Sequence, residues 1–177
     1  MRIFTCLFVL SCLLSSGARA QDTPVPAKIV YRDVALRLNG YGEREVMWMD
    51  VYRCALYLAR RSADPAEIVR TREPKLLVIR VLTDNAPADM PARWRETLDA
   101  ELTAPLFRRI KKSYRRAGTG DVLKFAYLPG KGTRFYFNDR LGLTDPGYGL
   151  MESLLDQWLG ARPVSRNLKR LLAPATG

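Results

Sequence analysis

The chain has 177 residues, a formal net charge of +11 from 29 Lys and Arg against 18 Asp and Glu, no histidine and three cysteines. Histidine and cysteine are the usual ligands for zinc and copper, and histidine is the usual general base, so neither a metal or other cofactor nor a hydrolytic triad is expected. The length fits one domain with a sizeable core.

Residues 1–20 have the pattern of a cleavable secretory signal. They carry one early cation, Arg2, then an apolar run too short for a membrane anchor, and they end on Ala18-Arg19-Ala20. We expect export across the inner membrane into the periplasm, and a mature chain that starts at Gln21. Lipidation at Cys12 is the alternative.

Loss of this signal leaves 157 residues and a charge of +9, because Arg2 and Arg19 leave with it, and leaves Cys54 as the one cysteine. An internal disulfide is therefore excluded. The basic surface should attract anionic partners. Export disfavours nucleic acid, so anionic lipid, an acidic protein or a small carboxylate are the candidates; a merely solvated basic surface is the alternative.

Residues 21–29 contain two prolines and no periodicity, which predicts an extended N-terminal segment before a domain at 30–177. Alternating apolar residues from Val34 to Leu38 predict a half-buried strand. Residues 38–58 are apolar in both parities, which predicts one central strand covered on both faces. Arg44 and Arg53 interrupt it, and a buried arginine needs a carboxylate, carbonyl groups or an anionic ligand beside it.

A helix is predicted to start at Asp64-Pro65, followed by a strand at 75–82. Helical periodicity then runs from Met90 to Tyr114, with a break near Pro105. One face of its second part is cationic, and we call this the basic helix face: Arg108, Arg109, Lys111, Lys112, Arg115 and Arg116. Such a run is typical of a solvated helix face, and contact with an anionic membrane surface is the functional alternative.

Residues 121–138 predict a hairpin around Pro129-Gly130-Lys131-Gly132, and Asn138-Asp139 predicts a further turn. The remainder is predicted to be helical, with an apolar stripe at 150–159 and a last helix capped by Ser165. Six or seven mostly antiparallel strands and four helices predict an α+β fold, with the helices packed on one face of a curved sheet.

Several short motifs, in their order and spacing, resemble the bacterial, secreted branch of the chalcone isomerase-like family. They are LNGYGER (38–44), VYRCALYL (51–58), DP (64–65), Trp94, YLPGKGT (127–133) and WLG before PV (158–164). The resemblance implies an open-faced β-sandwich with a ligand cleft between the sheet and its helices. Plant members cyclise chalcones to flavanones without a cofactor, and related members bind fatty acids instead.

By this resemblance, Arg44 matches the arginine that guides the phenolate in the isomerases and holds the carboxylate in the fatty-acid binders. Tyr52 stands where the isomerases have their catalytic threonine and where the binders have tyrosine. Residues 83–89 lack the isomerases' loop tyrosine and lysine. We therefore expect a non-catalytic binder of a hydrophobic carboxylate; an intramolecular lyase with Arg44 as its catalytic residue is the alternative.

The candidate ligand-binding residues are Arg44, Tyr52 and Arg53. In one straight strand, Arg44 and Tyr52 would lie about 26 Å apart at about 3.3 Å per residue, so a shared headgroup would require a bend. Alternatively, Arg44 pairs with Glu43, Glu45 or Asp50. Arg53 is expected to extend its charged end to solvent, to pair with an acid, or to serve as a second cation for an acidic ligand.

Overall fold

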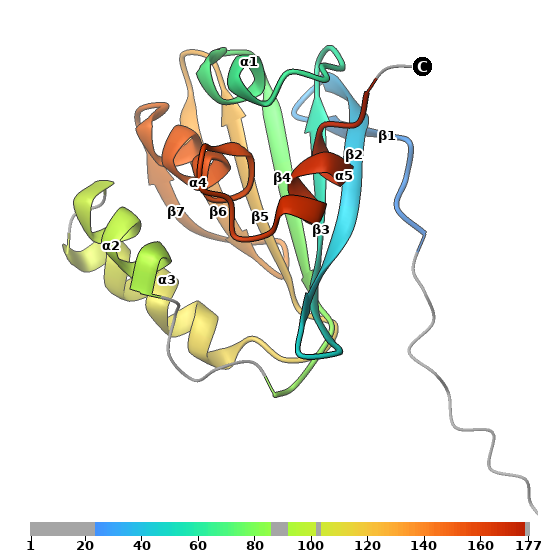
Figure 1. Cartoon of the computed structure of the whole chain (residues 1–177). Helices are drawn as coiled ribbons and strands as arrows, with labels where there is room; N and C mark the ends of the chain where they lie inside the picture. The colour runs from blue at the N-terminus through green and yellow to red at the C-terminus, as the bar shows by residue number, and fades with distance from the viewer. Residues whose placement is uncertain (1–23, 86–91, 102–103, 176–177) are drawn as a thin grey trace, which may run out of the picture.

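The computed structural model describes residues 24–85, 92–101 and 104–175. The predicted signal and the first three residues of the segment at 21–29 lie outside the described residues, and β1 begins within that segment at Lys28. Seven strands form one sheet in which every neighbouring pair is antiparallel and the strand order is the chain order (Figure 1). The strands are β1 Lys28–Tyr31, β2 Val34–Val46, β3 Met49–Leu58, β4 Lys75–Val81, β5 Val122–Leu128, β6 Gly132–Phe137 and β7 Arg140–Asp145.

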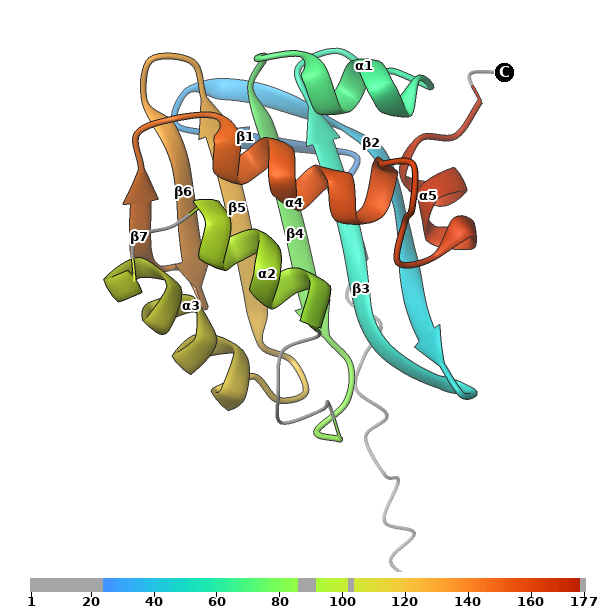
Figure 2. The same ribbon diagram turned by 60° about the vertical axis from the view of Figure 1, so that its left-hand side comes forward.

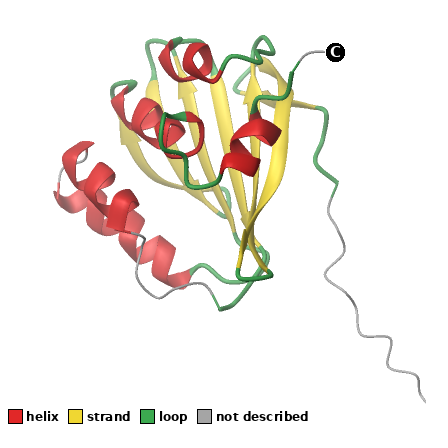
Figure 3. Cartoon of the chain, viewed as in Figure 1, coloured by secondary structure: helices red, strands yellow, loops and turns green. Residues whose placement is uncertain are grey.

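The described residues also form five helices, which cover one face of the curved sheet (Figures 2 and 3). They are α1 Pro65–Arg70, α2 Ala92–Glu101, α3 Ala104–Arg116, α4 Gly149–Leu159 and α5 Arg166–Leu172. The predicted α+β class, with an antiparallel sheet and its helices on one face, is confirmed. The caps predicted from sequence are also present, since Asp64 accepts a hydrogen bond from the Ala66 amide and Ser165 from the Leu168 amide.

Two sequence predictions about the strands were wrong. Residues 38–58 are not one strand, because the chain reverses at Met47 and Trp48 and pairs β2 with β3 as a hairpin. In addition, the turn predicted at Asn138-Asp139 is present, but it leads into strand β7 and not directly into the predicted helical region. All four turn residues have positive φ, the conformation that a two-residue hairpin of type I′ requires.

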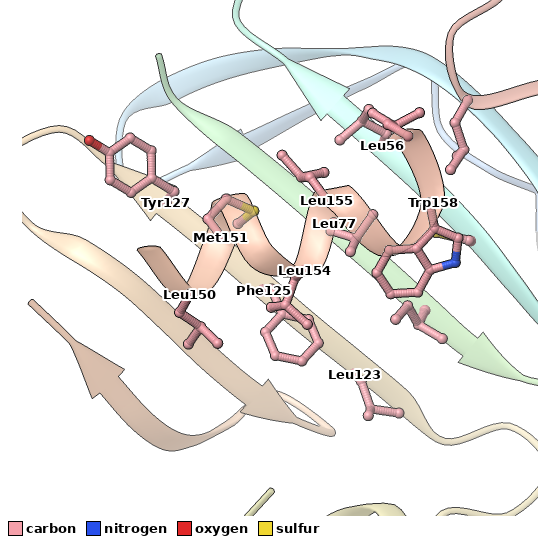
Figure 4. Close-up of a cluster of buried hydrophobic side chains, with 14 of the residues drawn as sticks. Leu56, Leu77, Leu123, Phe125, Tyr127, Leu150, Met151, Leu154, Leu155 and Trp158 are labelled. Atoms are coloured by element: carbon pink, nitrogen blue, oxygen red, sulfur yellow. The ribbon is translucent and has the colours of Figure 1, made fainter. Parts of the chain in front are cut away.

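The main core lies between the sheet and α4 (Figure 4). The apolar stripe of α4 is buried as its periodicity predicts, and Trp158 is 0% exposed. The facing side chains come from alternate positions of three central strands: Leu56, Leu77, Leu123, Phe125 and Tyr127. This packing fixes the position of α4 over the sheet, and with it the Trp158 indole.

A smaller core lies on the opposite face of the sheet, beneath β1 and the start of β2, and includes Leu36, Ala55, Tyr57, Leu76 and Ala126. The Tyr31 and Tyr136 hydroxyls are hydrogen-bonded at 2.8 Å, which ties β1 to β6. The sheet is therefore curled, with its first hairpin folded behind the central strands (Figure 2).

Close approach of α5 to β2 depends on small residues in the strand. A Cβ on Gly40 would lie 2.0 Å from the Leu171 carbonyl oxygen. Next to it, buried Asn39 donates to the Leu172 carbonyl at 2.7 Å and accepts from the Ser62 amide at 2.8 Å. These contacts anchor the C-terminal helix on the sheet.

Candidate functional site

The hairpin places Arg44 directly opposite Tyr52, as cross-strand partners of β2 and β3. Directly opposed residues have Cα atoms about 4.5 to 5.5 Å apart and project their side chains to the same face. The separation of about 26 Å expected from a single strand was therefore wrong. No glycine is needed at the bend, because Met47 and Trp48 themselves take the positive φ angles.

Tyr52 lies on the helix-covered face and packs against the main core. Its hydroxyl oxygen accepts a hydrogen bond from the Trp158 indole Nε1 at 3.0 Å, and the two rings meet edge to face at 6.5 Å between centroids. Burial strongly raises the pKa of the Tyr52 hydroxyl, although the charge of Arg44 acts in the opposite direction. The phenol therefore keeps its proton at any ordinary pH.

Arg44 is half-buried, and its Nη1 donates to the Glu45 carbonyl at 2.9 Å. Within the described residues no carboxylate forms an ion pair with it, although Glu43, Glu45 and Asp50 are close along the hairpin. The expected alternative of a rim ion pair for Arg44 is therefore not what the structure has. A guanidinium offers five N–H donors, so most of its hydrogen-bonding capacity points beyond this one carbonyl.

Arg53 lies on the opposite face of the sheet, because successive residues of a strand alternate between faces. Its Nε and Nη2 donate to the same Glu43 carboxylate oxygen at 2.9 and 2.5 Å. Of the three expected roles, pairing with an acid is the one observed. The pair borders an open cleft of about 500 Å³ beside Pro24 and Leu171, and the structure does not bring Arg53 together with Arg44 and Tyr52.

The surroundings of Tyr52 on the helix-covered face are apolar. Cys54, Ile79, Val81 and Leu123 are buried there, and Phe107 of α3 packs partly buried against them. Burial raises the pKa of the Cys54 thiol, which is accordingly neutral. Arg44 and Tyr52, next to this apolar surface, form a site that suits a molecule with an anionic end and an apolar body.

Trp158 lies in the apolar stripe predicted at 150–159 and is buried as that stripe predicts, but no sequence pattern predicts its hydrogen bond to Tyr52. The two residues are 106 positions apart, so only the tertiary fold brings them together. The indole holds the phenol oxygen in place and so belongs to the site as a positioning residue. The Trp94 side chain lies outside the described part of the structure.

The basic helix face is part of α3. Arg108 and Lys112 are exposed, while Arg109 donates to the Gly142 carbonyl at 3.4 Å. The side chains of Arg115 and Arg116 lie outside the described residues. Contact of this face with an anionic membrane surface stays a prediction.

The described residues contain no group of three or more His, Cys, Asp and Glu residues placed to hold a metal ion. None of the described helices has both the length and the apolar character needed to cross a membrane.

Comparison with known proteins identifies the fold and the family. The sequence model of the chalcone isomerase-like family matches residues 17–173. The chain belongs to the chalcone isomerase-like family. Its structure is similar to the crystal structure of a fatty-acid binding protein of Arabidopsis thaliana, with a TM-score of 0.61 and 14% identity over 84% of this chain and 90% of that one. The comparison with curated proteins by sequence found no match.

Proposed function

We propose that this member of the chalcone isomerase-like family is a non-catalytic binder of a hydrophobic carboxylate such as a fatty acid, with Arg44 and Tyr52 at the headgroup. The observation that carries the proposal is the direct cross-strand pairing of Arg44 with Tyr52 on the apolar, helix-covered face. The plant structure of the same fold is a fatty-acid binding protein, which agrees with this class of ligand. We further propose that the protein acts after export, in the periplasm.

The two side chains have complementary roles in holding a carboxylate. Arg44 supplies a permanent charge and a planar fork of donors that matches the two carboxylate oxygens. Tyr52 stays protonated, because burial raises its pKa, and so can donate a neutral hydrogen bond. The Trp158 indole donates to the Tyr52 oxygen and so fixes the position of the phenol beside Arg44.

Affinity and orientation come from different parts of such a ligand. A hydrogen bond to a charged group contributes about 1.5 to 3 kcal/mol, whereas each buried methylene contributes about 0.8 kcal/mol. A long acyl chain therefore supplies most of the binding free energy. Arg44 determines which end of the molecule enters beside Tyr52.

The test is oleate binding by isothermal titration calorimetry, together with mass spectrometry of small molecules released from the purified protein. Arg44→Ala should weaken oleate binding about 10- to 150-fold, the equivalent of one charged hydrogen bond. Tyr52→Phe keeps the ring and should weaken binding about 2- to 10-fold. Arg53→Ala is the matched control on the opposite face and should bind oleate as the wild type does.

A folded Arg44→Ala variant that binds oleate as tightly as the wild type would remove Arg44 from the headgroup site. Incubation with chalcone tests the lyase alternative in the same preparation. Turnover above the spontaneous rate that is lost in Arg44→Ala would replace the binder proposal with an isomerase.

A further inference from the structure

The turn between β2 and β3 presents large apolar side chains to solvent. Met47 is 72% exposed and Trp48 is 86% exposed, and both flanking residues, Val46 and Met49, are exposed as well. Within the described residues no hydrogen bond or ring contact involves the Trp48 side chain. In Figure 1 this turn lies at the lower end of the sheet, opposite α1. The fold itself gains little from a tryptophan in this position.

Two other hairpins of the same protein show what this turn geometry ordinarily contains. The β1–β2 turn uses Arg32 and Asp33, and the β6–β7 turn uses Asn138 and Asp139. All three turns have positive φ at both central residues, between 46° and 67°. Asn and Asp tolerate this conformation through local hydrogen bonds, whereas Met and Trp have no such compensation.

We infer that the Met47–Trp48 turn is a membrane-contact element that inserts into the interfacial region of a lipid bilayer. A two-residue turn is narrow, so its tip can enter a penetrable medium such as the interfacial region of a bilayer. An indole combines an apolar body with a polar N–H and favours the membrane–water interface. Methionine is flexible and adapts to an irregular apolar environment.

The charges beside the turn indicate which kind of bilayer it enters. Glu45 and Asp50 flank it on the two strands, and both are exposed. Carboxylates at this position disfavour an anionic surface, so insertion is driven by apolar burial and suits a zwitterionic bilayer. Binding through the turn should therefore be insensitive to salt, in contrast to binding through the basic helix face, which would be screened by salt.

The position of the turn also connects it to the carboxylate site. Arg44 precedes Met47 by three residues on the same hairpin, so insertion of the turn brings the site to the bilayer surface. Fatty acids partition into bilayers through their acyl chains. If the proposed function holds, the turn is the element at which the protein exchanges its ligand with a membrane.

The test is flotation with phosphatidylcholine vesicles, with tryptophan emission recorded in the same samples. Wild-type protein should bind, and the emission of the exposed Trp48 should shift to shorter wavelength. Trp48→Ser should lower the partition coefficient about tenfold and abolish the shift. Leu141→Ser removes an exposed apolar side chain of β7, far along the chain from the turn, and should change neither measurement. All variants carry the same N-terminus, so residues 1–20 contribute equally.

A second variant separates loss of binding from loss of folding. Met47→Asn combined with Trp48→Gly installs residues that favour this turn, so the protein should stay folded and still fail to bind vesicles. Charge reversal at Arg108 and Lys112 should leave vesicle binding at the wild-type level. High salt should not change vesicle binding by the wild type. Equal binding by wild type and Trp48→Ser, or binding abolished by salt, would overturn the inference.

Further outcomes distinguish this inference from the proposed function. If wild-type protein forms a dimer that Trp48→Ser does not form, and does not bind vesicles, the turn is a self-association contact. That outcome would overturn membrane insertion. Arg44→Ala that loses oleate but still binds vesicles supports both proposals. Vesicle binding by the wild type without any oleate affinity would support the membrane contact and reject the carboxylate site.

Discussion

Lys75 and Arg44 are two cations at opposite ends of the helix-covered face of the sheet, and the protein surrounds them differently. Lys75 is 1% exposed; its Nζ donates to the Thr71 carbonyl, to the Thr71 hydroxyl at 3.1 Å and to the Glu73 carbonyl at 3.5 Å. It also lies 5.4 Å from the Tyr148 ring centroid. Arg44 is half-buried and donates to one carbonyl.

The contrast separates a structural cation from a binding cation. At the closed end of the sheet, beneath α1, the chain itself satisfies the charge, and nearby Asn39 ties β2 to α5 and to Ser62. At the open end, beside the β2–β3 turn, a charge with spare donors stands next to exposed apolar residues. Stability should therefore depend on the closed end, and binding on the open end.

The largest effect is expected from Gly40→Val, which breaks the packing of the closed end. The new side chain would overlap the backbone of Leu171 and Leu172, so α5 must move away from β2. We expect the free energy of unfolding to fall by about 3 kcal/mol, as measured by urea denaturation. Gly147→Ala, where a Cβ meets nothing closer than 3.7 Å, is the control and should change little.

Lys75 should give the closed end a pH dependence. Burial lowers its pKa from 10.5 to about 8. Between these values the unfolded state binds more protons than the folded state, so this group makes folding more favourable as pH rises from about 8 to 10.5. From pH 7.5 to 10, wild type should gain about 1 to 3 kcal/mol of stability relative to Lys75→Met.

Denaturation at several pH values measures this gain, and Lys131→Met, at an exposed position in the β5–β6 turn, serves as the reference substitution. A constant difference between wild type and Lys75→Met across this range would mean that Lys75 keeps an ordinary pKa. Burial of the Lys75 charge would then not reduce the stability of the folded state.

At the open end, in contrast, substitution of the turn residues should raise the free energy of unfolding. Replacing Met47-Trp48 with Asn-Gly relieves two unfavourable positive φ angles and should raise the free energy of unfolding by about 1 kcal/mol. Thermal denaturation measures the change. A loss of stability would show that Met47 and Trp48 contribute to folding, which would weaken the contrast between the two ends.

The smallest effect should come from Arg44→Ala on stability. Arg44 has one carbonyl contact and no ion pair with a described carboxylate, so its removal should change the free energy of unfolding by less than about 0.5 kcal/mol. A destabilisation above about 2 kcal/mol would make Arg44 a structural cation like Lys75.

Local signals in the sequence predicted much of the fold. The apolar stripe of α4, the Ser165 cap and the β5–β6 hairpin are each encoded within a few residues, and all are present. The turn at Met47 and Trp48 could not be predicted in this way, because neither residue type favours positive φ. As a result, the sequence predicts one strand where the structure has two, and it does not predict the register that pairs Arg44 with Tyr52.

The candidate site was predictable only in part. Arg44 and Tyr52 were selected by family resemblance, and the fold places them together. The partner of Arg53 followed from strand register, since Glu43 is its direct cross-strand neighbour. The contact of Trp158 with Tyr52 depends on how α4 crosses the sheet, and no sequence pattern specifies this crossing.

The strand order has a consequence for how the protein folds. Because each strand pairs with the one before it, the sheet can grow in chain order as the chain emerges, although β5 can pair with β4 only after α2 and α3 have been made. Helices α4 and α5 add contacts of much longer range, since Trp158 returns to Tyr52 across 106 residues and Leu172 to Asn39 across 133. Completion of the native state therefore waits for the last helix to be synthesised, and until then no helix packs against Gly40 and Gly42 of β2.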